Sequence, residues 1–381
     1  MIHRPRFRHA ALSAAIVPAL AACADSASPI GQQANAIWRR DFAPAARATV
    51  VAGGPGGVAI ATGDSLRVLD NATGAPLWSA AWRDTLAGGA MDARFVVAPT
   101  RRGAVVYARA DGAVLTRDTS DAPGTFATVA TAIRDSIAIL LRSDGAARAI
   151  VARTGRELWR IPARCNVLGC GTLRAVILRP DVVVLSGRLL DGMGSFLTAH
   201  RVTTGEAVTT GFTPRVPYAV NIAATGDTLD LVVMDQINDS LFVTRGTTGT
   251  VRLRAGLRLP ANGVPTPLVG EPSPMAMGRT IVTANRGGQT PTGTAFDLAS
   301  GAIRWQVVGF IPVGTCGTGY RAADNEGYRL YDAERGSVYL RVASFPPRNP
   351  PPPVGTPLRP VPAGDIVVTY ASPTSIRVYA C

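Results

Sequence analysis

The chain has 381 residues, including 40 glycines and 29 prolines; 47% of its residues are apolar and 17% are charged. This composition disfavours both a helical protein and extensive disorder, so we expect an all-β fold with an ample core. The formal net charge is +13 and all 39 basic residues are arginine, which excludes a lysine-dependent phosphate loop and a Schiff base.

Histidine is almost absent after the first residues of the chain. His3 and His9 precede the cleavage site inferred below, which leaves His200 as the only histidine of the mature chain. A multi-histidine metal site is therefore excluded, and we predict no bound metal. The positive charge favours anionic partners, unless the arginine content reflects only codon bias. Nucleic acid is not an expected partner, because the sequence has no nucleic-acid-binding motif and carries an export signal.

Residues 1–22 have the order of a secretory signal peptide. Three arginines precede an apolar run at residues 10–20, and Cys23 follows two alanines. This order resembles the signals of bacterial lipoproteins, which implies cleavage before Cys23 and attachment of lipid to that cysteine. The next residue is Ala24, and by the same resemblance this implies an outer-membrane lipoprotein that faces the periplasm. Residues 23–35 then form a short polar tether.

Residues 36–42 predict a strand that has no companion strand before it. The run contains Trp38 between Ile37 and Arg39 and has the character of an outer strand of a sheet.

From residue 69 onward one unit recurs along the chain. Each copy has a β-rich run, a turn with a glycine, and a second run with a bulky residue four positions after that glycine; the clearest copies end at Trp78, Trp159 and Trp305. The turn glycines are Gly74, Gly112, Gly155, Gly205, Gly249, Gly301 and Gly336. They are separated by 35 to 52 residues, a period that fits a four-stranded propeller blade.

Each repeated turn predicts a local geometry. The glycine supplies the positive φ of a tight hairpin. Asp70, Asp297 and Asp332 lie four residues before their glycines. Because they recur with the repeat, we interpret them as residues that cap the turn and not as catalytic acids.

These motifs resemble the pyrroloquinoline-quinone-like (PQQ-like) β-propeller repeat, whose signature is approximately Ala-x-Asp-x-x-Thr-Gly-x-x-x-Trp. The resemblance covers residues 36–381 and implies a wheel of four-stranded blades with tryptophans wedged between adjacent blades. The blade-docking tryptophans would be Trp38, Trp78, Trp159 and Trp305. Seven glycine-marked units and one composite blade give eight blades, or seven if the weak unit around Gly112 merges with a neighbour.

The end of the chain predicts how the ring closes. Two β-like runs, at residues 366–370 and 376–380, are followed by no outer strand. We expect the strand at residues 36–42 to complete this last blade, because closure removes an exposed sheet edge. The proline-rich segment at residues 345–362 precedes these runs; it is either a structural spacer or a polyproline docking segment.

Four cysteines remain besides Cys23. An even number in an exported protein indicates disulfides. Cys165 and Cys170 are close enough in sequence to staple a loop, and Cys316 and Cys381 would then pair and tie down the terminal strand. The sequence allows three connectivities. The spacing and the lack of a nearby histidine disfavour a redox or zinc site.

The sequence shows no recognisable set of catalytic residues. The Gly-x-Ser-x-Gly nucleophile elbow is absent, and we expect His200 to be a strand-surface residue and not a general base. Quinone-dependent dehydrogenases carry adjacent cysteines and calcium-binding carboxylates, which are not seen in this sequence. We therefore predict no cofactor and no enzymatic activity.

The lipoprotein signal, the length and the blade count resemble those of the lipid-anchored propellers of the bacterial outer-membrane protein assembly machinery. This resemblance implies a non-catalytic, monomeric scaffold in the cell envelope that binds envelope proteins, such as an outer-membrane β-barrel assembly complex. Two alternatives remain: a propeller that binds or senses a small ligand, and a degenerate quinone-dependent dehydrogenase.

Overall fold

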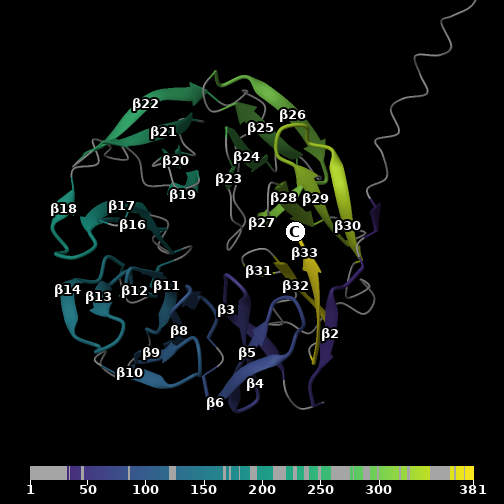
Figure 1. Cartoon of the computed structure of the whole chain (residues 1–381). Helices are drawn as coiled ribbons and strands as arrows, with labels where there is room; N and C mark the ends of the chain where they lie inside the picture. Colours follow the sequence, from purple (N-terminus) through teal and green to yellow (C-terminus); the bar gives the residue numbers. More distant parts are fainter. Residues whose placement is uncertain are drawn as a thin grey trace, which may run out of the picture.

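The computed structural model shows a ring of β-sheets (Figure 1). It describes residues 32–33, 35–43, 47–84, 86–119, 126–165, 169–170, 173–179, 181–188, 195–208, 220–225, 230–235, 240–247, 250–258, 275–277, 279–285, 292–297, 300–316, 319–323, 327–343, 361–363, 366–372 and 374–381. All regular elements of these residues are strands. In this part of the chain no helix is long and apolar enough to cross a membrane.

The described strands form eight sheets, seven of four strands and one of five. Sheets 1 to 4 contain β3 (Ala48–Gly54), β4 (Gly57–Thr62), β5 (Ser65–Asp70) and β6 (Pro76–Ala81); β7 (Ala90–Met91), β8 (Phe95–Thr100), β9 (Gly103–Ala108) and β10 (Val114–Asp118); β11 (Thr128–Arg134), β12 (Ile137–Arg142), β13 (Ala147–Val151) and β14 (Glu157–Ile161); and β15 (Arg174–Arg179), β16 (Val182–Arg188), β17 (Ser195–Arg201) and β18 (Ala207–Val208).

The second half of the chain repeats this order. Sheets 5 to 8 contain β19 (Val220–Thr225), β20 (Asp230–Asp235), β21 (Ser240–Thr247) and β22 (Thr250–Arg258); β23 (Met275–Met277), β24 (Thr280–Asn285), β25 (Thr292–Asp297) and β26 (Ile303–Val308); β27 (Ile311–Cys316), β28 (Gly319–Ala323), β29 (Gly327–Asp332), β30 (Val338–Ala343) and β1 (Gln32–Gln33); and β31 (Val361–Ala363), β32 (Ile366–Ser372), β33 (Ser375–Ala380) and β2 (Trp38–Asp41).

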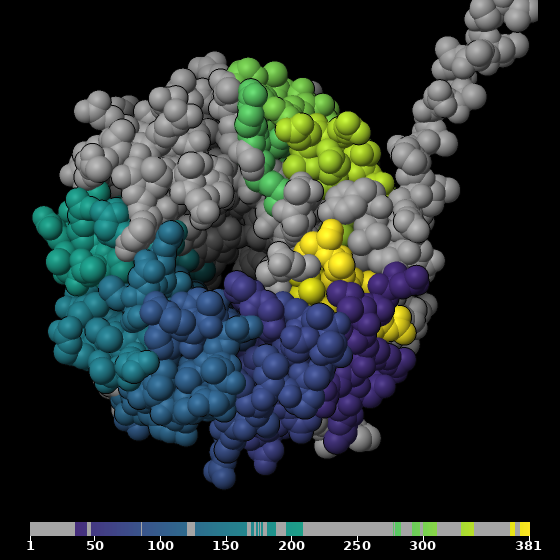
Figure 2. Space-filling view, viewed as in Figure 1, coloured from purple at the N-terminus to yellow at the C-terminus, as the bar shows by residue number. Residues whose placement is uncertain are grey.

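The sheets follow one another around a closed ring. The first strand of each sheet contacts the first strand of the next one, and β31 of sheet 8 contacts β3 of sheet 1. The first four sheets pack side by side around one half of the ring, from purple to teal in Figure 2. The fold is therefore an all-β, PQQ-like propeller, as the repeats predict.

The N-terminal strand β2 completes the last sheet. It pairs antiparallel with β33, with Trp38 opposite Val378 and Asp41 opposite Ser375. Backbone hydrogen bonds of 2.7 Å from Ile37 and Phe42 to carbonyls of the terminal hairpin extend this pairing at both ends. The two ends of the chain thus share one sheet, which gives β33 a partner on each side.

The strand β1 corrects the extent of the predicted tether. Gln32 and Gln33 were expected to belong to a polar linker, but they pair in parallel with Leu340 and Arg341 of β30. Two consecutive glutamines show no alternation of apolar residues, so their sequence carries no strand signal. Their backbone pairing places this segment on the edge of sheet 7.

The apolar core lies between neighbouring sheets. Between sheets 1 and 2, Val68 and Trp78 pack with Val105 and Tyr107. A similar cluster joins sheet 8 to sheet 1, where Trp38 contributes a partly buried side chain. Sheets 1, 2 and 3 are consequently packed on both of their faces, which ties the position of each of these blades to its two neighbours.

Candidate functional site: blade contacts and a stapled loop

A tryptophan of one sheet docks on a glycine turn of the next. In sheet 1, the Trp78 indole Nε1 donates a hydrogen bond to the Arg109 carbonyl at 2.8 Å. The indole ring covers Gly112, where an added Cβ would lie 2.5 Å from it. Glycine at this position thus allows both the turn and the close approach of the ring.

The same arrangement recurs at three other sheet boundaries. The hydrogen bonds are Trp38 Nε1 to the Asn71 carbonyl at 2.9 Å, Trp159 Nε1 to the Val202 carbonyl at 2.7 Å and Trp305 Nε1 to the Ala333 carbonyl at 3.0 Å. In each case the acceptor lies three residues before the turn glycine, at Gly74, Gly205 and Gly336 respectively. Each tryptophan therefore contacts the neighbouring blade in two ways, by packing its ring on the glycine and by donating one hydrogen bond.

The glycines of these turns have the expected backbone conformation. The φ values are +68° at Gly74, +75° at Gly112, +69° at Gly155, +70° at Gly205, +73° at Gly301 and +67° at Gly336. Gly249, the remaining predicted turn glycine, lies outside the described residues. These values occupy the left-handed region that L-residues with a Cβ rarely adopt.

The recurrent aspartates cap the turns. The Asp70 carboxylate accepts hydrogen bonds from the Thr73 amide at 2.8 Å and from the Thr73 hydroxyl at 2.8 Å. These bonds to Thr73, the side-chain one foremost, lower the pKa of Asp70. Asp297 and Asp332 accept equivalent bonds within their own turns. Their carboxylates are thus engaged in local structure.

The boundary between sheets 2 and 3 has no tryptophan. Thr116 occupies the equivalent place above Gly155. Two residues further along the same strand, Asp118 forms an ion pair with Arg148 of sheet 3, with a hydrogen bond of 2.9 Å from Arg148 Nη1 to Asp118 Oδ1. Both residues are buried, 8% and 3% exposed. No sequence pattern pointed to this pair, because its members come from different repeats 30 residues apart.

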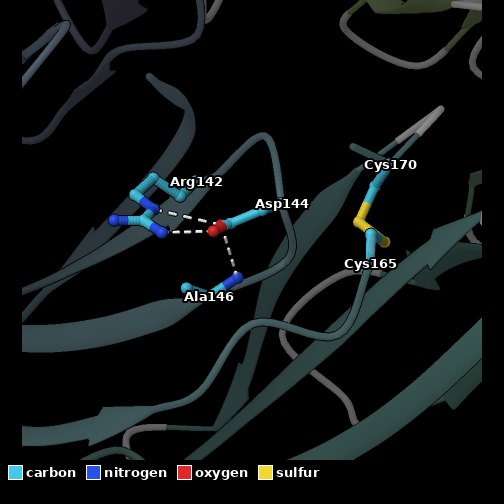
Figure 3. Close-up of a disulfide and its surroundings, with 5 residues drawn as sticks. All are labelled: Arg142, Asp144, Ala146, Cys165 and Cys170. Atoms are coloured by element: carbon cyan, nitrogen blue, oxygen red, sulfur yellow. Dashed lines mark hydrogen bonds and ion pairs between the residues drawn. A yellow bond between two sulfur atoms is a disulfide. The ribbon is translucent and has the colours of Figure 1, made fainter. Parts of the chain in front are cut away.

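A disulfide staples a loop beside the β12–β13 turn (Figure 3). Cys165 and Cys170 are bonded, with their Cα atoms 5.5 Å apart, which is the pairing that the sequence favoured. The loop is also held by its backbone: the Cys170 amide donates to the Ser143 carbonyl at 2.7 Å and the Cys165 amide to the Asp144 carbonyl at 2.9 Å. The disulfide thus closes this loop on itself, and the two backbone hydrogen bonds attach it to the β12–β13 turn.

The turn beside the disulfide contains a buried carboxylate. Asp144 accepts hydrogen bonds from Arg142 Nε at 3.0 Å and from the Ala146 amide at 3.1 Å, as Figure 3 shows. Burial raises the pKa of the Asp144 carboxyl, but the Arg142 guanidinium and the Ala146 amide outweigh it and hold the pKa below its usual value. Asp144 is therefore a structural anion of this turn.

The other predicted cysteines are only partly accounted for. Cys381 is disulfide-bonded and packs next to Leu330 and Val367. The side chain of its expected partner, Cys316 in β27, lies outside the described residues, as does the expected lipidation site Cys23. The Cys316–Cys381 pairing and the modification of Cys23 therefore stay predictions.

His200 is buried, which corrects the expectation of a strand-surface residue. It is 5% exposed, and its ring stacks on Trp159 with ring centroids 6.3 Å apart. His200 Nδ1 lies 3.1 Å from the Gly205 carbonyl. Burial lowers the pKa of His200. Apolar and polar side chains alternate only imperfectly over residues 196–202, so the sequence does not show which face of β17 is buried. His200 lies on the face that packs against Trp159 of the preceding sheet.

The described outer strands expose apolar side chains. These are Ile37, Leu77, Val114, Ile303 and Val308, from 42% to 73% exposed. They lie on β6, β10 and β26, or directly before β2. They are spread over four sheets, and single exposed apolar side chains of this kind are common on protein surfaces. Among the described residues, no group of three or more His, Cys, Asp or Glu side chains could hold a metal ion.

Comparisons with known proteins agree with this geometry. The family described as outer membrane protein assembly factor BamB matches residues 33–167 and 62–307, which together span well over half of the chain. The chain belongs to this family. BamB from Moraxella catarrhalis shares the fold, with a TM-score of 0.60 and 14% identity over 92% of this chain and 98% of that one.

The propeller is shared beyond the BamB family. A quinohemoprotein alcohol dehydrogenase from Comamonas testosteroni has a TM-score of 0.62 and 12% identity, over 91% of this chain and 76% of that one. The computationally designed Ika8 protein has a TM-score of 0.60 and 14% identity, over 89% and 98%. Likeness at these identities shows the fold alone. No curated protein matches the sequence.

Proposed function

We propose that this BamB-family protein is a non-catalytic scaffold of the cell envelope, anchored by lipid at Cys23 and facing the periplasm from the outer membrane. Its partner would be a protein of the outer-membrane assembly machinery. The family match over residues 33–307 carries this proposal. The basic, apolar and cysteine segments at the N-terminus support the anchor.

The geometry suits a scaffold. Four blade boundaries are held by an indole contact and a fifth by the Asp118–Arg148 pair, so these blades present their surface groups at fixed separations. The exposed apolar residues Leu77 and Ile303 lie on strands of different blades. A rigid surface binds without a large entropic cost of ordering. A lipid anchor further confines it to the vicinity of a membrane partner and raises its effective concentration.

The test is a crosslinked capture of the lipidated protein from its native envelope, read by mass spectrometry. We expect an outer-membrane β-barrel protein of the assembly machinery among the crosslinked partners. A variant with Leu77→Ser and Ile303→Ser removes two exposed apolar groups and is expected to capture less of it. Ala113→Ser, at an exposed position beside β10, is the matched control and is expected to capture as much as the native chain.

Two outcomes would contradict the proposal. Efficient recovery of the bait without any envelope protein would favour a propeller that binds a small ligand. Quinone-dependent alcohol oxidation by the purified protein would show that the chain is an enzyme.

A further inference from the structure

The short strand β1 determines where the N-terminal segment leaves the ring. Gln32 and Gln33 pair with Leu340 and Arg341 on the outer edge of sheet 7. The chain then passes to sheet 8, where β2 forms the outer strand. Figure 1 shows this purple segment along the edge of β30 and β33. The N-terminal segment is thus attached to two successive blades.

The direction of β1 identifies the face from which the preceding residues emerge. Because β1 is parallel to β30, the chain before Gln32 points toward the beginning of β30. That end follows the Gly336 turn, closed by a 2.9 Å bond from the Gly336 amide to the Asp332 carbonyl. Gln32, where the tether begins, therefore lies opposite Leu340, four residues after Gly336, with its N-terminal side directed toward the Gly336 turn.

The glycine turns share one face of the ring. Trp38, Trp78 and Trp159 each reach from the start of an outer strand to the glycine turn of the next sheet. Trp305 makes the same contact with the Gly336 turn. We call the side that carries these turns the glycine-turn face. The β8–β9 and β12–β13 turns lie on the opposite face, because successive turns of a meander alternate between the two ends of its strands.

The length of the tether limits which part of the ring can approach a membrane. Cys23 is nine residues before Gln32, so the tether spans at most about 30 Å. A 346-residue domain has a radius of gyration of about 20 Å and hence a diameter of roughly 50 Å. A tether from sheet 7 cannot bridge that diameter. It would also lose about 20 Å in passing along one strand to the opposite face.

We propose that β1 orients the propeller, so that the sheet 7 rim and the glycine-turn face lie toward a phospholipid surface and the β8–β9 turn lies away from it. This inference rests on the lipid anchor of the proposed function. Without the β1 pairing, the tether would run from Cys23 to Trp38, fifteen residues. Its reach of about 50 Å would then equal the diameter of the ring and impose no orientation.

The test measures energy transfer from the protein to acceptor-labelled lipids in phosphatidylethanolamine–phosphatidylglycerol vesicles. The lipidated full-length protein carries a genetically encoded fluorescent residue at Glu334, in the Gly336 turn, or at Arg102, in the β8–β9 turn. Both positions are exposed. We expect at least about twofold more transfer from position 334, because the geometry separates the two sites by tens of ångströms.

A second variant isolates the role of β1. Gln32→Pro with Gln33→Pro removes the backbone donors of the strand. We expect unchanged vesicle association and loss of the difference between positions 334 and 102. Ala27→Pro with Ser28→Pro lies outside β1 and is expected to keep the difference.

The outcomes are distinguishable. Equal transfer from both positions of vesicle-bound native protein would overturn the orientation and leave the anchor intact. A difference that survives the prolines at 32 and 33 would overturn the role of β1. Failure of the native protein to associate with vesicles would overturn the anchor, and with it the orientation.

Discussion

At the scale of single residues, blade docking requires glycine for two separate reasons. Gly112 has a φ of +75°, and a Cβ there would lie 2.5 Å from the Trp78 indole. Gly309 has a φ of +81°, but a Cβ there would meet nothing within 4 Å. The two positions therefore separate the backbone requirement from the requirement for close packing.

Alanine at these two glycines should destabilise the protein to different extents. Both substitutions impose a left-handed conformation on alanine, at a cost of roughly 1–2 kcal/mol. Gly112→Ala also displaces the indole, which costs roughly 1–3 kcal/mol more. Thermal unfolding followed by circular dichroism measures both. Equal midpoints for Gly112→Ala and Gly309→Ala would show that the indole contact contributes nothing.

The buried His200 predicts a loss of stability in mild acid. Burial holds the folded-state pKa of His200 below its ordinary value, so the unfolded chain binds the proton first as the pH falls. Folding stability should therefore decrease from about pH 6.5 downward. His200→Gln should remove this part of the pH dependence in unfolding experiments between pH 7.5 and 5.5. An identical pH dependence in both proteins would contradict this origin.

The sequence predicts the conformation and role of single residues correctly where those residues belong to the repeated turn motif. The positive φ of Gly74 and the capping by Asp70 follow from a local motif. The position of each indole above the next blade's glycine does not follow from a local motif, because it depends on how two repeats pack against each other. The burial of His200 was missed for the same reason.

At the scale of elements, the boundary between sheets 2 and 3 is held differently from the four boundaries with a docked tryptophan. An ion pair takes the place of an indole there, between Asp118 of β10 and Arg148 of β13. Breaking a buried ion pair leaves an uncompensated charge, which costs roughly 3–5 kcal/mol.

Arg148→Met should therefore destabilise this boundary strongly, and adding Asp118→Leu should restore much of the loss. The exposed pair Arg39–Asp41, with side chains 54% and 61% exposed, is the matched control; Arg39→Met should change stability by no more than about 1 kcal/mol. Urea unfolding of the single and double variants measures these differences. If Arg148→Met were as mild as Arg39→Met, the pair would not hold the boundary.

The elements differ in how far their sequences predict them. The continuous apolar runs of the inner strands, such as those of β4 and β12, and the turn signals between them predict most sheets. β1 has no such signal, since its pairing uses only backbone groups of Gln32 and Gln33. The ion pair between sheets 2 and 3 likewise cannot be predicted from the sequence, because a single charged residue on a strand gives no sign of whether it is buried or exposed to solvent.

At the scale of the whole molecule, the decisive feature is closure. The sequence predicts that residues 36–42 complete the last blade, because the terminal hairpin lacks an outer strand and the first strand lacks a sheet. The structure describes this pairing between β2 and β33. The described strands form eight sheets, where the sequence left eight or seven open, because the weak repeat at Gly112 has no tryptophan of its own.

Closure also connects the fold to the proposed function. The segment that completes sheet 8 leads directly back to the tether, so the same stretch of chain would close the ring and carry the anchor. Without β2, the edge of β33 would be open to pairing with other chains. The buried cluster that includes Trp38 would also lose an indole, which costs roughly 3–5 kcal/mol.

One measurement tests closure most directly: the thermal unfolding and solution size of two truncated forms, produced without the signal segment. Removal of residues 1–35 keeps β2, and we expect a monomer that unfolds at nearly the same temperature as a form beginning at residue 24. Removal of residues 1–42 deletes β2, and we expect a clearly lower midpoint together with self-association through β33. If the shorter form were equally stable and monomeric, the ring would not depend on its N-terminal strand.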